Sequence, residues 1–184
     1  MMRALTTMLL ISTISPAFAD EPVADEKITE ARILTKAFGA DMKKALKTAV
    51  AKNGMAGAIQ VCGKISPEVA HSHSQNGWSV GRTSHRVRNM ANAPDTWESQ
   101  VLVDFARRHE AGESFAQMEF GEWVSGEYRY MKAIGTQPFC ISCHGSNIMT
   151  TVQTEIDTQY PDDTATQFKV GDLRGAFTLK WRSD

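Results

Sequence analysis

The pentapeptide Cys140-Ile141-Ser142-Cys143-His144 constrains this chain more than any other stretch. Two thiols separated by two residues and followed at once by a histidine form the pattern of a c-type haem attachment site. In such a site both sulfurs bond to one edge of the porphyrin, and the adjacent imidazole binds the iron. A structural zinc site would need a second ligand pair, and a thioredoxin-like pair would need a strand–helix crossover; neither pattern accompanies the motif. The motif predicts one covalent haem c with His144 as proximal ligand.

The N-terminus has the pattern of a secretory signal peptide over residues 1–19. Arg3 gives a positive start, Ala4–Ile14 is a short apolar stretch, and Ala17-Phe18-Ala19 is a small-x-small cleavage site. The apolar stretch is shorter than the ~20 residues that span a bilayer. We therefore expect cleavage before Asp20 and no stable membrane anchor afterwards.

Composition and charge fit one soluble globular domain over residues 20–184. The chain has 184 residues, of which 42% are hydrophobic and 22% charged, and its net charge of −1 argues against a nucleic-acid partner. Bacterial haem c is attached outside the cytoplasmic membrane. The signal peptide and the haem motif together predict a periplasmic protein.

Hydrophobic spacing predicts long helices in the first part of the chain. An amphipathic helix is expected over Glu26–Lys52, ending at Asn53-Gly54, and a second over Met55–Lys64. Ser66-Pro67 is interpreted as the start of a further helical piece. Later helices are expected from Asp95, which forms a capping-box pattern with Glu98, to about Glu110, and over Met149–Thr158.

Strand patterns dominate the second part of the chain. We expect strands over Trp78–Ser84, Phe115–Phe120, Glu122–Ile134 and Gly175–Trp181, with a turn at Ser125-Gly126. Helices first and a strand meander later predict an α+β fold. This differs from small cytochromes c, which are nearly all helical and carry the haem motif near the N-terminus.

Cys62 is left over once Cys140 and Cys143 are assigned to haem, because the chain has three cysteines. An odd cysteine in an exported protein deserves a separate explanation. It could be a small buried hydrophobe or a distal ligand of iron. The residues alone leave a methionine, His71, His73 or an open site as alternatives.

Several motifs resemble the Tll0287-like c-type haem domain family, formerly a domain of unknown function. They run along nearly the whole chain after residue 19: Ala58-Ile59-Gln60-Val61-Cys62 with Pro67, Gly77–Ser84, Arg88-Asn89, Asn92–Asp95 with Trp97-Glu98, Cys140–Gly145, Tyr160-Pro161 and Gly171–Ala176. Met90 departs from the pattern, since the family often has proline after Arg-Asn.

The resemblance implies a PAS-like fold, in which an antiparallel sheet holds the haem. It also implies iron ligated by one histidine and one cysteine thiolate. Carried over by position, His144 is the proximal ligand and Cys62 the distal one, which favours Cys62 over the alternatives above.

Arg82, Arg86 and Arg88 are candidates to pair with the haem propionates, because a guanidinium matches a carboxylate in bidentate fashion. The alternative is a solvated basic loop. The resemblance favours Arg82 and Arg88, which lie inside matching motifs.

A thiolate ligand predicts a low reduction potential, because the extra negative charge of the ferrous state is costly in an apolar pocket. Two strong ligands favour an electron carrier that serves an unidentified redox partner protein. A redox or small-gas sensor acting through a separate partner is the alternative. A peroxidase-like enzyme, which needs an open iron and a distal acid–base group, is less favoured.

Overall fold

The structure is a computed structural model that describes the backbone of residues 21–183 and the side chains of residues 26–183. The predicted signal peptide, residues 1–19, lies outside the described residues and stays a prediction.

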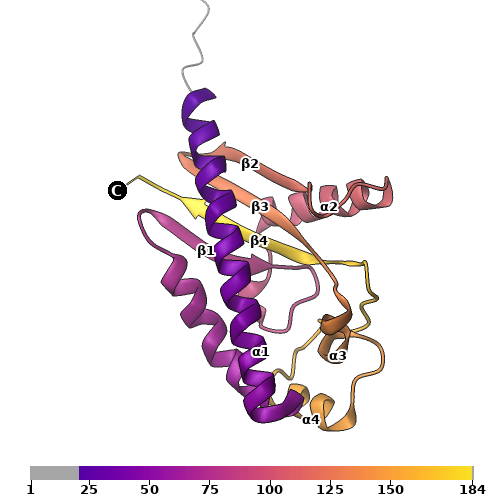
Figure 1. The fold of residues 1–184 in the computed structure, drawn as a ribbon. Helices are drawn as coiled ribbons and strands as arrows, with labels where there is room; N and C mark the ends of the chain where they lie inside the picture. Colours follow the sequence, from indigo (N-terminus) through magenta and orange to yellow (C-terminus); the bar gives the residue numbers. More distant parts are fainter. Residues whose placement is uncertain (1–20, 184) are drawn as a thin grey trace, which may run out of the picture.

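A helical hairpin opens the fold. Helix α1 runs from Glu21 to His73 and is interrupted at Gly54, whose φ of 67° and ψ of 179° are not helical. Glycine takes a positive φ without steric cost, so the chain reverses at this position as predicted. The two segments run side by side in opposite directions (Figure 1), and His73 Nε2 lies 3.0 Å from Asp41 Oδ2 across them.

The predicted restart of the helix at Ser66 is wrong, since the second segment continues through Pro67 without a break. A proline inside a helix removes one backbone hydrogen bond, here to the carbonyl of Gly63. Packing on both sides of the proline compensates, because Ile59 packs against a later helix and Val69 against the sheet. Ser66 therefore does not cap a helix start, and its hydroxyl contacts Arg82 instead.

The sheet has four antiparallel strands in the order β1-β4-β3-β2. Their bounds are Trp78–Thr83, Leu173–Trp181, Glu127–Gly135 and Glu119–Val124 in that order. The turn at Ser125-Gly126 is confirmed. The strand predicted over Phe115–Phe120 is wrong for residues 115–118, where Met118 N–H donates to the Phe115 carbonyl in a turn.

Helices cover both faces of the sheet. On one face, Ala31 and Phe38 of α1 pack against Trp78, Val80, Tyr128, Tyr130 and Leu179. On the other, helix α2, Thr96–Glu110, packs Val101, Leu102 and Phe105 against Met131, Ala133 and Ala176. The capping box predicted for Asp95 and Glu98 is confirmed. The α+β prediction is confirmed as a mixed fold of helices and one antiparallel sheet.

The connection from β3 to β4 carries the pentapeptide. It contains helix α3, Ile141–His144, and helix α4, Thr150–Gln159. Short 3₁₀ turns lie at Pro138–Cys140 and, earlier in the chain, at Met90–Asn92. Val152 and Ile156 of α4 pack against Ile59, so this connection lies beside the second segment of α1 (Figure 1). Among the described helices, none combines the length and apolar character needed to cross a membrane.

Candidate functional site

The pentapeptide is held by backbone hydrogen bonds to the segment that precedes β4. The Gly145 N–H closes the single turn of α3 on the Ile141 carbonyl at 2.9 Å. Phe168 N–H donates to the His144 carbonyl at 2.9 Å, and Gln167 N–H donates to the Gly145 carbonyl at 3.0 Å. These contacts fix the histidine relative to the sheet.

The tautomer of His144 follows from one short contact. His144 Nδ1 lies 2.6 Å from the Ala165 carbonyl oxygen, which can only accept, so Nδ1 carries the proton and donates. Nε2 then has a free lone pair, the state required of a metal-binding imidazole. Burial, followed by the charges of Arg174 and Arg88, holds the pKa of His144 well below its usual value, so the ring is neutral at pH 7.

Arg174, in β4, is a site residue that the sequence reasoning missed. Its Nη2 lies 3.5 Å from His144 Nδ1, its guanidinium stacks over Phe168 at 4.9 Å, and Nη1 donates to the Arg86 carbonyl at 3.3 Å. Because His144 Nδ1 already donates to Ala165, Arg174 acts on the ring through its charge. The available signal was an arginine inside the final strand, in the motif Gly171–Ala176.

Cys62 lies on the second segment of α1, within electrostatic range of the pentapeptide. Burial raises the pKa of Cys62, and the positive charges of Arg82 and Arg88 oppose this rise. Burial also raises the pKa of Cys143, and the charge of Cys62 raises it further. Cys143 also packs against the cluster that contains Ile59, three residues before Cys62, so the fold brings this helical segment and the pentapeptide together.

The two alternative histidines lie farther along the same helical segment. His71 is exposed, and His73 contacts Asp41 and packs edge-on against Phe38. Nine residues of helix separate His71 from Cys62, which corresponds to about 13 Å along the axis. Neither histidine lies at the level of Cys62.

The three arginines of the β1 region have different partners. Arg82 Nη2 lies 3.5 Å from the Ser66 hydroxyl. Arg88 Nη2 donates to the Cys143 carbonyl at 2.6 Å and to Asp163 Oδ2 at 3.0 Å, while its Nε is buried without a partner. Arg86 donates to the Thr166 carbonyl and stacks on Phe168.

Arg82, Arg88 and Arg174 form a positive cluster around the cysteines and His144. Burial, reinforced by the charges of Arg82 and Arg88, lowers the pKa of Arg174 to about 10, so this guanidinium is charged at neutral pH. Of the three arginines, Arg88 alone forms an ion pair with a carboxylate of residues 26–183, that of Asp163. An uncompensated buried charge is unfavourable, so this cluster suits a ligand that brings about two negative charges.

Tyr160, at the end of α4, closes one side of Cys62. A methyl group at Gly63 would lie 2.7 Å from Tyr160 Oη, so the phenol rests directly on the helix backbone beside Cys62. Burial raises the pKa of Tyr160, and the charge of Cys62 adds to this effect. The close approach is possible because residue 63 has no side chain.

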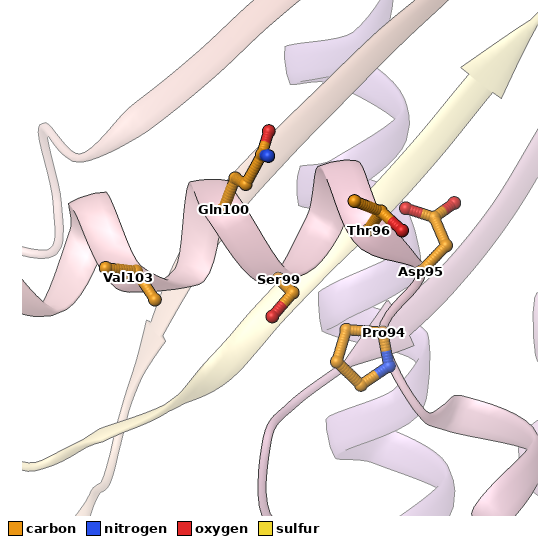
Figure 2. A pocket seen from close by; sticks show the side chains of 6 residues that line it. All are labelled: Pro94, Asp95, Thr96, Ser99, Gln100 and Val103. Atoms are coloured by element: carbon orange, nitrogen blue, oxygen red, sulfur yellow. The ribbon is translucent and has the colours of Figure 1, made fainter.

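Two surface hollows lie along α2 and do not include the predicted ligands. Figure 2 shows the first, which lies at the start of the helix and is lined by Pro94, Asp95, Thr96, Ser99, Gln100 and Val103. The second, about 430 Å³, extends toward Arg86 and Phe168. Phe168 meets the His144 ring edge-on at 6.4 Å.

The donor set of the described residues is too small for a metal held by protein ligands alone. No group of three or more His, Cys, Asp or Glu side chains comes together within that part of the chain. A zinc site of the usual four ligands is therefore not formed there. A metal that brings most of its own ligands needs fewer from the protein. The site offers such a metal the thiols of Cys140 and Cys143, the free Nε2 of His144 and the thiol of Cys62.

Fold and site define a class: an α+β protein whose β3–β4 connection carries two cysteines and a histidine, within electrostatic range of a third cysteine on a helical hairpin. A family model described as Tll0287-like matches residues 20–181, so the chain belongs to this family, and the resemblance is confirmed. The fold is similar to the crystal structure of the cyanobacterial haem protein Tll0287, with a TM-score of 0.64 and 23% identity over 86% of this chain and 96% of that chain. No curated protein matched the chain.

Proposed function

We propose that the protein is an exported, mono-haem, c-type cytochrome-like electron carrier with a low reduction potential. The observation that carries this proposal is the arrangement at His144, whose Nδ1 donates to Ala165 and leaves Nε2 free, between Cys143 and the arginine cluster. The relative of similar fold is described as a haem protein.

Each residue of the site has a chemical task in this proposal. Cys140 and Cys143 would hold haem through thioethers, and His144 would be the proximal ligand of its iron. Cys62 would be the distal ligand, although burial of its free thiol means that a metal must stabilise the thiolate. Arg82, Arg88 and Arg174 would offer positive charge to the propionates. Bound haem supplies a one-electron couple at iron.

The low potential follows from charge. A thiolate beside ferric iron nearly neutralises the centre, whereas the ferrous state keeps an extra negative charge in a partly buried site. The arginine cluster would oppose this effect in part.

Localisation and the finer fold assignment belong to the same proposal. The family match begins at residue 20, directly after the predicted cleavage site, which supports export to the periplasm. We also propose that the fold is PAS-like, as an antiparallel sheet with helices on both faces.

Production in a bacterial host with the haem c maturation machinery tests the cofactor. We expect a coloured periplasmic protein whose mass exceeds that of the cleaved chain by one haem, and whose pigment stays with the protein in acidified organic solvent. Cys140→Ala/Cys143→Ala is the matched control and should lose the covalent pigment. A colourless wild-type protein would overturn the proposal.

Addition of carbon monoxide to the reduced protein separates the carrier from the sensor. Two retained axial ligands leave no vacant position, so the carrier predicts an unchanged spectrum. Rapid binding would instead favour a site that opens on reduction, as a small-gas sensor needs, and turnover with peroxide would indicate an enzyme.

A further inference from the structure

Arg174 is half-buried beside the imidazole of His144 and forms no ion pair with a carboxylate of the described residues. Its hydrogen bond to the Arg86 carbonyl and its stacking on Phe168 hold the guanidinium in place. Both contacts orient the side chain, and neither neutralises its charge. The charge therefore acts on whatever lies across His144.

One atom, Nδ1 of His144, both fixes the orientation of the imidazole ring and lies next to the charge of Arg174. The Ala165 carbonyl fixes the Nδ1 proton, and the guanidinium nitrogen lies 3.5 Å from the same Nδ1. A cation at this position stabilises the state of the site with one more electron, because that state is more negative.

We propose that Arg174 is a positioning residue for His144 whose charge raises the reduction potential of the site. This inference rests on the haem function proposed above and goes beyond it by assigning a role to one residue of β4. Removing the charge should favour the oxidised protein. We expect a shift of about tenfold in the redox equilibrium, which corresponds to about 59 mV for one electron.

Arg86 offers a matched control. Its guanidinium stacks on the same ring, Phe168, at 3.5 Å, and donates to the Thr166 carbonyl. Arg86 thus shares the packing environment of Arg174, but of these two arginines Arg174 is the one that lies against the His144 ring. Replacing Arg86 removes one of the two guanidinium groups that stack on Phe168 and leaves Arg174 in place beside His144.

The test is a redox titration of holoprotein carrying Arg174→Gln, Arg174→Lys or Arg86→Gln, together with electron paramagnetic resonance of the oxidised forms. The proposal expects a lower midpoint and altered low-spin g values for R174Q. R174K, which keeps the charge, should restore most of the midpoint, and R86Q should stay within twofold of the wild-type equilibrium.

A wild-type midpoint in R174Q, or an equal fall in R86Q, would overturn the role of Arg174. If R174Q does not mature, Arg174→Met, which keeps the side-chain length against Phe168, is judged by the same two outcomes. Failure of the haem proposal itself would appear differently, as wild-type protein without covalent haem.

Discussion

At the residue scale, Cys62 decides which kind of haem site this is. Replacing Cys62 by serine should remove the low-spin thiolate signal in the oxidised protein and raise the midpoint by at least tenfold in the redox equilibrium, about 59 mV or more. The reason is that the ferrous state no longer carries the thiolate charge. Electron paramagnetic resonance and redox titration measure the two effects.

Lys64→Ser is the control for this substitution, because Lys64 is exposed on the same helical segment. It should leave both spectrum and midpoint unchanged. A thiolate signal that persists in Cys62→Ser would assign the distal position to another residue.

The contact between Gly63 and Tyr160 gives a second prediction at this scale. Gly63→Ala places a methyl group 2.7 Å from Tyr160 Oη, so one of them must move. We expect a loss of about 1–3 kcal/mol in the free energy of unfolding, the usual cost of overpacking. Because alanine has the higher helix propensity, any gain would show that Tyr160 moves freely.

A second substitution identifies the clashing atom. Tyr160→Phe removes only the hydroxyl, so Gly63→Ala/Tyr160→Phe should recover most of the lost stability in a chemical denaturation series. Equal losses with and without the hydroxyl would place the conflict elsewhere.

The sequence predicted the site residues that belong to a spaced pattern and missed the one that depends on tertiary structure. Cys140, Cys143 and His144 lie within five consecutive residues, and Cys62 stood out as the remaining cysteine. Arg174 could not be selected, because its proximity to His144 arises only when β4 and the segment at Ala165 fold together. Whether Cys140, Cys143, His144, Cys62, Arg82 and Arg88 bind haem stays a prediction.

At the element scale, the start of α2 is held by charge. Partial burial alone would raise the pKa of Asp95, but hydrogen bonds from Arg129, the Glu98 N–H and Lys180 lower it to about 2. The Asp95 charge therefore stabilises the fold above its ordinary pKa of 3.8, and this contribution is lost as the pH falls toward about 2.

Asp95→Asn keeps a capping side chain and removes the charge. Because the Asp95 side chain is 42% exposed, we expect the variant to be less stable at pH 7 by no more than about 1 kcal/mol. Thermal unfolding should show this difference shrinking below pH 4. Asp104→Asn removes a similarly exposed carboxylate from the same helix and should cost less, and a difference independent of pH would contradict the role of the Asp95 charge.

Elements were predictable where local signals and tertiary packing agree. The end of the first helical segment at Gly54 and the capping box of α2 are local features, and both were predicted. Pro67 was misread because packing of Ile59 and Val69 outweighs one lost hydrogen bond. Phe115 was assigned to a strand on its apolar character. Its ring stacks on His109 at 4.3 Å, a contact that the sequence alone does not reveal.

At the scale of the whole molecule, the apolar core is unevenly distributed. The two clusters that hold α1 and α2 on the sheet each have seven buried residues. The cluster between α4 and the second segment of α1 has three, Ile59, Val152 and Ile156. We therefore expect the part of the molecule that carries Cys62 to gain the most stability from the haem proposed above.

Loss of the cofactor should consequently loosen one region and not the sheet. In Cys140→Ala/Cys143→Ala, we expect hydrogen exchange to accelerate at least tenfold over residues 55–73 and 150–159, while β3 and β4 keep their protection. Cys62→Ser, which retains the thioethers, should accelerate exchange mainly over residues 55–73, because only that segment loses its bond to the site. Uniform acceleration across the strands would mean that the site and the sheet unfold as one unit, and unchanged exchange in both variants would mean that the fold does not depend on the cofactor.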